Sequence, residues 1–292
     1  MRSLLEYILL RAGISVLRLF PEHWIRSGMA GLFSLVQFRR NVADMNLQMI
    51  YPEKSSDWRE QLMKKMYYSY GLTAVETYIT PPHKLFPRMD VSGFKLVEKE
   101  RAKGRGVIIA SGHLGNFEMA GRLMAYKAPL GVVIKRQHNP FFDRYANQQR
   151  IKDNCTLIHS GNALRPILKL LRHNGIVVIM TDQNARGQGY QLDFLGQPAS
   201  THITAARIAI KYSIPVVIAG VIRNEKGYPK LIFSSPIDPE EYEDNEAGYV
   251  TLMQKITDNF SEMVNAYPEH WFWVHRRWRH AEQGREWIID DG

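Results

Sequence analysis

Short runs of consecutive apolar residues alternate with longer segments from residue 106 onward. Such apolar runs indicate buried strands, and the segments between them have the length of helices. Strands that alternate with helices pair in parallel and are covered on both faces. The pattern therefore predicts an α/β fold with a largely parallel central sheet flanked by helices. The predicted strands are 107–110, 132–134, 156–158, 176–180 and 215–219, with 230–233 as an edge strand, and the predicted helices are 115–127, 140–153, 162–173 and 199–212.

A different pattern occupies residues 1–38, the most apolar stretch of the chain. Arg11 and Arg18 interrupt its first apolar run, Pro21 ends that run, and the second run, 27–38, carries no charge. A helix that crosses a membrane needs about 18 or more apolar residues, so neither run predicts a span. No small-residue cleavage site follows a clean apolar region, which argues against a signal peptide.

Residues 1–38 have instead the features of helices that lie in a membrane interface. Arg11 and Arg18 share one helical face, which we expect to point toward lipid headgroups. Arg39 and Arg40 close the segment, as expected beside an anionic cytoplasmic leaflet. The alternative is an amphipathic helix that packs on the core of the protein itself. We predict an N-terminal membrane-docking helical extension over 1–38.

The remaining segments complete a single domain. Residues 41–92 are expected to be mostly helical, with Asp57 and Glu60 resembling a capping box at the start of one helix. Residues 246–266 carry apolar positions at helical spacing and predict a terminal amphipathic helix. Because no linker or internal repeat separates these parts, we predict one α/β domain over 39–292.

The charge balance and the cysteine count narrow the classes of function. With 38 Lys and Arg against 29 Asp and Glu the net charge is +9, which favours anionic partners such as nucleic acid, anionic lipid or an acidic protein. The one cysteine, Cys155, excludes an internal disulfide and any site that needs two thiolates. We interpret Cys155 as a small buried hydrophobic residue.

A candidate catalytic histidine follows the first predicted strand. His113 lies between Gly112 and Gly115, where a helix is about to begin, and Glu118 follows five positions later. Histidine titrates near neutral pH, so His113 is a candidate general base with Glu118 holding its other ring nitrogen. Backbone N–H groups near Gly115 and Asn116 are candidate donors to an oxyanion. The alternative is a capping turn whose histidine is simply satisfied by hydrogen bonds.

Polar residues also follow the other predicted strands. Arg136 and Asn139 come after the second strand, Arg150 lies in the next helix, and Asp182 follows the strand 176–180. The active residues of open α/β sheets gather at the carboxyl ends of strands. We therefore expect these four to bind an anionic headgroup. Helix capping or a surface ion pair is the alternative for each of them.

Several known motifs are absent, and the C-terminus is ambiguous. The chain has no GxSxG elbow, no Walker A loop, no complete GxGxxG and no HExxH. Its segment 268–279 interleaves Trp and Arg, which suits nucleic acid, a membrane interface, or a buried aromatic tail with exposed arginines. No nucleic-acid fold motif accompanies this segment, so we do not expect a nucleic-acid partner.

Taken together, these residues resemble the late acyltransferases of lipid A biosynthesis, the lauroyl/myristoyl transferase family of the lysophospholipid acyltransferase superfamily. The resemblance covers nearly the whole chain, and the order and spacing of its pieces make it specific. The pieces are Arg39-Arg40, Asn46-Leu47, Tyr51-Pro52-Glu53, His113 with Glu118, Arg136, Asn139-Pro140, Asp143, Asp182-Gln183, Phe194-Leu195-Gly196-Gln197-Pro198-Ala199, Thr201, Pro215-Val216-Val217, Pro268-Glu269-His270 and His275-Arg276-Arg277.

The resemblance implies transfer of a fatty acyl chain from acyl carrier protein to a hydroxyl of a lipid A precursor. It implies that His113 and Glu118 are catalytic, and that Arg136, Arg150 and Asp182 bind the headgroup. The residues between His113 and Glu118 are less bulky than in the commonest enterobacterial form, and they also resemble phosphatidylinositol mannoside acyltransferases. The acceptor is therefore less closely defined than the reaction.

No metal, cofactor or covalent acyl-enzyme is needed for the expected reaction. Acyl carrier protein is the expected donor, acyl-CoA is possible, and the expected location is the cytoplasmic face of the inner membrane. Acyl transfer to another glycolipid or to a lysophospholipid is the first alternative. Two further alternatives are a metal-dependent hydrolase with His113 and Glu118 as ligands, and a non-enzymatic protein that binds membrane surfaces.

Overall fold

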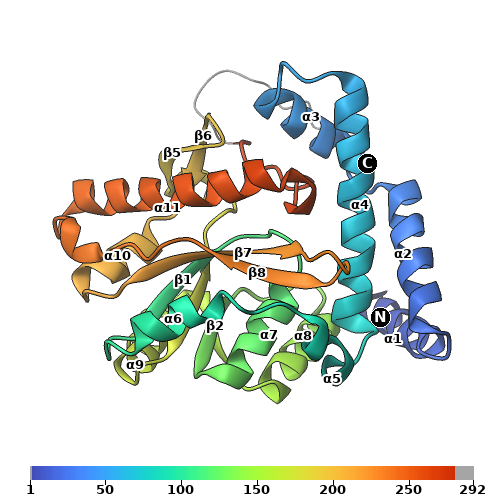
Figure 1. Cartoon of the computed structure of the whole chain (residues 1–292), viewed down its shortest axis with the longest axis horizontal. Helices are drawn as coiled ribbons and strands as arrows, with labels where there is room; N and C mark the ends of the chain where they lie inside the picture. The colour runs from blue at the N-terminus through green and yellow to red at the C-terminus, as the bar shows by residue number, and fades with distance from the viewer. Residues whose placement is uncertain (1, 280–292) are drawn as a thin grey trace.

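A six-stranded sheet forms the centre of the part of the chain that the structure describes. The computed structural model describes residues 2–279, and residues 280–292 of the predicted domain lie outside it. The strands are β1 (Val107–Ser111), β2 (Leu130–Ile134), β3 (Cys155–His159), β4 (Ile176–Met180), β7 (Val216–Arg223) and β8 (Pro229–Phe233). Their order is β3-β2-β4-β1-β7-β8, parallel except for the edge strand β8 (Figure 1). The predicted α/β class and largely parallel sheet are confirmed.

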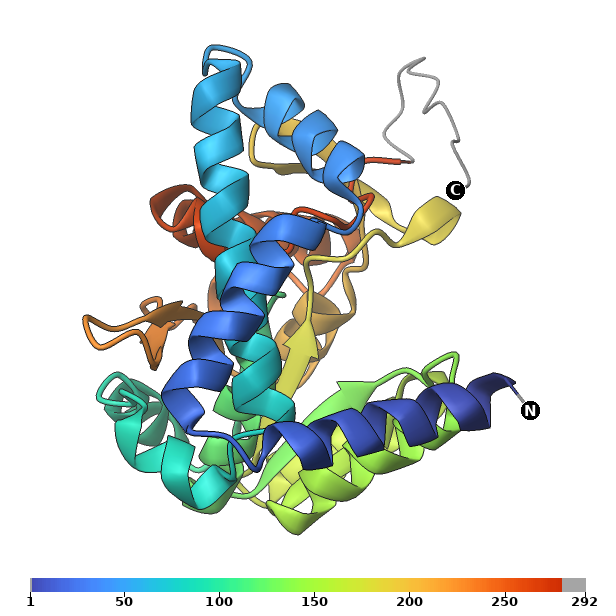
Figure 2. The ribbon, with the colours of Figure 1, turned by 90° about the vertical axis from the view of Figure 1, so that its right-hand side faces the viewer.

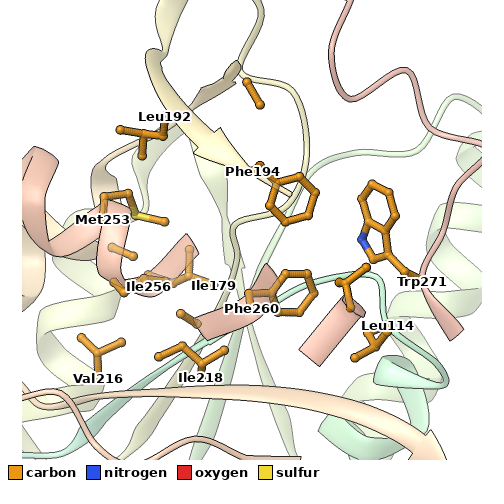
Figure 3. Close-up of a cluster of buried hydrophobic side chains, with 14 of the residues drawn as sticks. Leu114, Ile179, Leu192, Phe194, Val216, Ile218, Met253, Ile256, Phe260 and Trp271 are labelled. Carbon is orange, nitrogen blue, oxygen red and sulfur yellow. The ribbon is translucent and has the colours of Figure 1, made fainter. Parts of the chain in front are cut away.

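Both faces of the sheet are covered, because alternate side chains of each strand point to opposite sides. Ile108 and Ala110 of β1 belong to the core on one face, and Val107 and Ile109 belong to the core on the other. Figure 3 shows the first core, where Ile179, Val216 and Ile218 of the sheet face Met253, Ile256 and Phe260. That face is covered by α9 (Leu164–Arg172), α10 (Thr204–Lys211) and α11 (Glu246–Ala266), and the opposite face by α6 (Phe94–Arg101) and α7 (Phe117–Lys127).

The helices before the sheet form part of the packed body. They are α1 (Arg2–Leu17), α2 (Glu22–Val36), α3 (Arg40–Ile50), α4 (Ser56–Tyr78) and the short α5 (Pro82–Leu85). In Figures 1 and 2, α2 lies along α4. The two helices touch through backbone, since a Cβ on Gly71 would lie 2.5 Å from the Met29 carbonyl oxygen. Ser55 caps α4 by accepting a hydrogen bond from the Trp58 N–H, so the capping box predicted at Asp57 and Glu60 is wrong.

Arg11 and Arg18 point toward the protein, contrary to the prediction that they face lipid headgroups. The Arg11 guanidinium lies 4.5 Å from the centre of the Tyr145 ring on α8 (Pro140–Lys152). Arg18 donates to the carbonyl oxygens of Tyr78 and Ile79 at the end of α4. The Tyr145 ring and the Tyr78 carbonyl oxygen are distant from these arginines in the sequence, so the helical pattern alone did not reveal them as partners. Both arginines therefore fasten α1 to the body of the protein.

The outward faces of α1 and α2 are apolar. Large exposed side chains on these helices and their flanking turns are Leu4, Leu5, Ile8, Leu9, Leu10, Val16, Leu19, Phe20, Trp24, Leu32, Leu35, Val36 and Phe38. Within residues 2–279, no helix combines the length and the hydrophobicity that crossing a membrane requires.

A two-stranded hairpin was not predicted from the sequence, and the C-terminal segment was predicted only in part. The hairpin joins β5 (Tyr190–Phe194) to β6 (Gln197–Thr201), and its turn residues Leu195 and Gly196 both take positive φ. Such a turn matches the right-handed twist of a hairpin. In the C-terminal segment Trp271, Trp273 and Trp278 are buried, which confirms the buried aromatic tail, but Arg277 is buried with them. Cys155 is free and buried, as expected.

Gly115 provides a test of the turn that follows β1. It takes φ +63°, and a Cβ at this position would lie 2.0 Å from the Val221 carbonyl oxygen. We expect Gly115→Ala to lower the free energy of unfolding by about 3 kcal/mol or more, because strain and a backbone clash add. Gly104→Ala is the matched control, with φ +81° and open space around the Cβ, and should cost only about 1–2 kcal/mol. Urea unfolding measures both, and equal losses would contradict the clash.

Candidate active site

His113 and Asp182 meet at the carboxyl edge of the sheet. His113 follows β1, Asp182 follows β4, and the two strands pair directly, with Ser111 opposite Met180. The Asp182 Oδ1 lies 2.9 Å from the His113 Nδ1, and the Asp182 Oδ2 accepts the His113 backbone N–H at 2.7 Å. One carboxylate therefore holds both the ring and the backbone of the histidine.

A third hydrogen bond fixes the same carboxylate from the C-terminal segment. The Trp271 Nε1–H donates to the Asp182 Oδ2 at 2.9 Å, and only 2% of the Asp182 side chain is exposed. Burial alone would raise the pKa of Asp182, but the His113 charge and these hydrogen bonds outweigh it and hold that pKa below its ordinary value. Asp182 is therefore ionised at neutral pH.

The other nitrogen of the His113 ring faces outward. Of the His113 side chain 21% is exposed, and its Nε2 lies 3.2 Å from the Gln183 amide nitrogen. The Phe117 ring packs edge-on against the imidazole, with ring centres 4.8 Å apart. Burial alone would lower the pKa of His113, but the charge and hydrogen bond of Asp182 raise it above its ordinary value. With the Nδ1 proton donated to Asp182, the Nε2 lone pair is free to accept a proton.

Glu118 binds an arginine, and the predicted contact between Glu118 and His113 is wrong. The Arg150 Nε donates to both carboxylate oxygens of Glu118, at 2.9 and 3.1 Å, and the Arg150 Nη2 donates at 2.7 Å. Glu118 lies in the first turn of α7 and Arg150 in the last turn of α8. The two predicted residues are thus brought together, but as an ion pair. Catalytic and headgroup-binding roles for Glu118 and Arg150 stay predictions.

The turn between β1 and α7 uses one of the backbone donors that were predicted to hold an oxyanion. The Gly115 N–H donates to the His270 carbonyl oxygen at 2.8 Å, so this donor is already taken. The side chain of Asn116 caps α7 by accepting the Met119 N–H, and its amide donates to the buried Glu76. The predicted role of the Asn116 backbone N–H stays a prediction.

The two polar residues after β2 differ in what they contact. Asn139 caps α8 by accepting the N–H groups of Phe141 and Phe142, and its amide donates to the Ser3 carbonyl oxygen at 2.9 Å. Its side chain is therefore used within the fold, as the helix-capping alternative expected, and its role in substrate binding stays a prediction. Arg136 is exposed and makes no hydrogen bond or ion pair within residues 2–279. Its role in headgroup binding stays a prediction.

Three residues of the site were not singled out as functional from the sequence. Trp271 holds Asp182, the His275 Nε2 accepts the Asn184 N–H at 3.2 Å, and Arg277 donates to Ser200 and Thr201. Burial lowers the pKa of His275 to about 4, so this ring is neutral. These contacts fix the loop that carries Asp182, and their signals in the sequence are the aromatic and basic composition of 268–279 and the place of His275 and Arg277 among the residues of the family resemblance.

No group of three or more His, Cys, Asp or Glu side chains within the described part of the chain is arranged to hold a metal ion. His113 and Glu118, the ligands of the metal-hydrolase alternative, bind Asp182 and Arg150 respectively. The donor set required by that alternative is therefore not assembled here.

Comparison with known proteins identifies the family. The family model of the bacterial lipid A biosynthesis acyltransferases matches residues 2–280. Among curated relatives, the lipid A biosynthesis palmitoleoyltransferase of Escherichia coli is 24% identical over 246 residues, covering 82% of this chain and 79% of the relative. The lipid A biosynthesis lauroyltransferase of the same organism is 23% identical over 254 residues, covering 84% and 81%. A phosphatidylinositol mannoside acyltransferase of Mycobacterium tuberculosis is 22% identical over 220 residues, covering 72% and 68%.

Because the family model spans almost the entire chain, the protein belongs to the bacterial lipid A biosynthesis acyltransferase family. The enzyme class predicted from the sequence, an acyltransferase, is confirmed.

Trp271 offers a test of how the carboxylate is held. Trp271→Phe keeps the ring but removes the N–H that donates to Asp182, and we expect turnover to fall about 10-fold because a hydrogen bond to a charged group is lost. Trp273→Phe is the matched control, because the Trp273 N–H donates to the Pro268 carbonyl oxygen instead. Turnover and urea unfolding are measured for both variants. An equal loss of turnover in the control would contradict a specific role for Trp271.

Proposed function

We propose that this protein transfers a fatty acyl chain from the thioester of acyl carrier protein to a hydroxyl of a lipid A precursor, with His113 as the general base. The observation that carries the proposal is the His113 ring itself. A buried carboxylate binds its Nδ1, while its Nε2 faces outward. This arrangement, in a member of an acyltransferase family, suits removal of a proton from an acceptor hydroxyl.

The reaction divides into two proton movements and one exchange of bonds. The acceptor hydroxyl displaces Gln183 from the His113 Nε2 and gives up its proton there as its oxygen attacks the thioester carbon. Asp182 stabilises the imidazolium that forms, a role suited to an ionised buried carboxylate. The tetrahedral intermediate then breaks its carbon–sulfur bond, and the sulfur leaves as a thiol with the proton from His113. General base catalysis of this kind contributes about 10²–10⁴ in rate.

Acyl carrier protein is the proposed donor, and the positive net charge of this chain is compatible with it. The carrier is an acidic protein, and a net charge of +9 attracts it over a distance. Acyl-CoA carries the same thioester and remains the second candidate. Initial rates with matched acyl chains on the two donors decide between them, and a higher kcat/KM with acyl-CoA would contradict the choice.

For the acceptor we propose a lipid A precursor, and another glycolipid of the phosphatidylinositol mannoside type is the second candidate. Relatives named for each class match this chain. Arg136, exposed and unpaired within residues 2–279, is our candidate for a phosphate of the acceptor headgroup. Mass spectrometry of membrane lipids from cells with the active protein or with His113→Ala identifies the acylated product.

We propose that the apolar outer faces of α1 and α2 rest on the cytoplasmic face of the inner membrane. One substrate is a soluble carrier and the other an insoluble lipid, so the enzyme that joins them works at the boundary. Leu9 and Leu35 are 63% and 84% exposed, and burying such side chains in an interface is favourable.

The dependence of the rate on pH tests the base. His113 accepts a proton only when its ring is neutral, so the rate rises as pH increases through the pKa of His113. Asp182→Asn removes the charge that raises this pKa and leaves the burial that lowers it. We therefore expect the acid limb of kcat to move to lower pH, and the maximum of kcat to fall by about 10²–10⁴.

Glu118→Gln serves as the comparison for this measurement, because its carboxylate binds Arg150 and not the imidazole. The acid limb should keep its position in this variant. If Glu118→Gln moves the limb and Asp182→Asn does not, the assignment of Asp182 as the partner of the base is wrong.

Substitution of two exposed leucines tests the proposed membrane contact. We expect Leu9→Gln with Leu35→Gln to weaken binding to phospholipid vesicles about 100-fold, because two apolar side chains no longer bury. Activity on detergent-dispersed acceptor should be retained. Leu164→Gln is the control, since Leu164 is 50% exposed on α9, outside the proposed contact. Unchanged vesicle binding of the double variant in a sedimentation assay would contradict the proposal.

A further inference from the structure

A pocket separate from the His113 site opens between α2, α4 and the C-terminal segment. Its volume is about 570 Å³, within the range of small-molecule sites. Leu35 lines it at the end of α2, Lys64 and Lys65 on α4, and His270 after α11. Nothing in the mechanism above uses this space.

The walls of the pocket are largely apolar, and its charged side chains are Lys64, Lys65 and Arg223 with one carboxylate, that of Glu269. Arg223 is paired with Glu76, so the two lysines on α4 supply the positive charge at the rim. Lys64 contacts the exposed Glu60 at 3.4 Å, and Lys65 makes no ion pair within residues 2–279. The pocket therefore favours an anion.

The buried end of the pocket has a defined pattern of donors. The Arg223 Nε–H donates to the Ser69 hydroxyl oxygen at 3.3 Å, so the Ser69 proton points to the His270 Nδ1, 3.2 Å away. Burial lowers the pKa of His270 to about 4, which keeps the ring neutral, and its one proton is then on Nε2. The nearest carboxylate oxygen, on Glu269, is 3.6 Å from that nitrogen, beyond hydrogen-bond distance. The His270 Nε2–H is available to an anionic oxygen.

The mouth of the pocket continues into the apolar surface of α2. Leu35 both lines the pocket and is 84% exposed, and Leu32 and Val36 beside it are also exposed. A ligand that enters from this side therefore meets the apolar side chains of α2 first and then the two lysines at the rim. An apolar surface beside positive charge suits a lipid, whose acyl chains are apolar and whose headgroup is anionic.

We propose that this pocket binds the phosphate of an anionic phospholipid headgroup, with the acyl chains of that lipid remaining in the bilayer beside α2. The inference rests on the membrane contact proposed for α2 and is independent of the acyl-transfer chemistry. The phosphate would meet Lys65 and Lys64 at the rim and the His270 Nε2–H further in.

The test compares binding to two kinds of vesicle, phosphatidylcholine alone and phosphatidylcholine mixed with phosphatidylglycerol. The full-length protein should prefer the mixed vesicles. Lys64→Gln with Lys65→Gln should reduce that preference about 30-fold, the factor for two lysines at about 1 kcal/mol each. Lys169→Gln with Lys211→Gln removes the same charge from α9 and α10 and should keep the preference.

Two results would overturn the proposal. The pocket variant and the control variant lose the preference equally, or the pocket variant keeps it. Binding to phosphatidylcholine alone reports the α2 contact, and activity on detergent-dispersed acceptor reports the chemistry, so failure of either is seen separately.

Discussion

The carboxylate of Asp182 is almost completely removed from water, and a buried charge is tolerated only where hydrogen bonds and an opposite charge compensate for lost solvation. Its compensation comes from two distant parts of the chain. The turn after β1 supplies the backbone N–H and ring of His113, and the segment after α11 supplies the indole of Trp271. The three segments must therefore assemble together, and the requirement that keeps Asp182 charged also orients the base.

A second buried carboxylate joins the N-terminal helices to the same region. Glu76 on α4 binds Arg26 of α2 and Arg223 of β7, and it accepts the side-chain amide of Asn116, which caps α7. Through these contacts α2 is connected to the turn that carries His113. The N-terminal helices are consequently both an outward apolar surface and an inward structural support, whereas the sequence suggested a separable docking extension.

The strands were predictable because a doubly covered parallel strand is apolar at every position, and the same pattern placed His113 and Asp182 at strand ends, where the structure has them. The partner of His113 was predicted wrongly. Glu118 is near His113 in the sequence, whereas Asp182 is 69 residues away and becomes adjacent only through the pairing of β1 with β4. The hairpin β5–β6 was missed because Pro198 lies within β6, where a proline argues against a strand, and because residues 199–201 were assigned to the predicted helix 199–212. Arg11 and Arg18 were misplaced because periodicity shows that two residues share a helical face, but not what that face contacts.

The central claim is that an ionised Asp182 holds the Nδ1 proton of His113 and leaves Nε2 free to act as a base. Nitrogen-15 NMR of the imidazole, recorded across a pH titration of the full-length protein, tests this directly. At pH values above the transition we expect the Nδ1 to carry the proton and the Nε2 to carry none, and we expect the midpoint to lie above the ordinary histidine pKa of about 6.5. A neutral ring protonated at Nε2, or a midpoint below that value, would contradict the account.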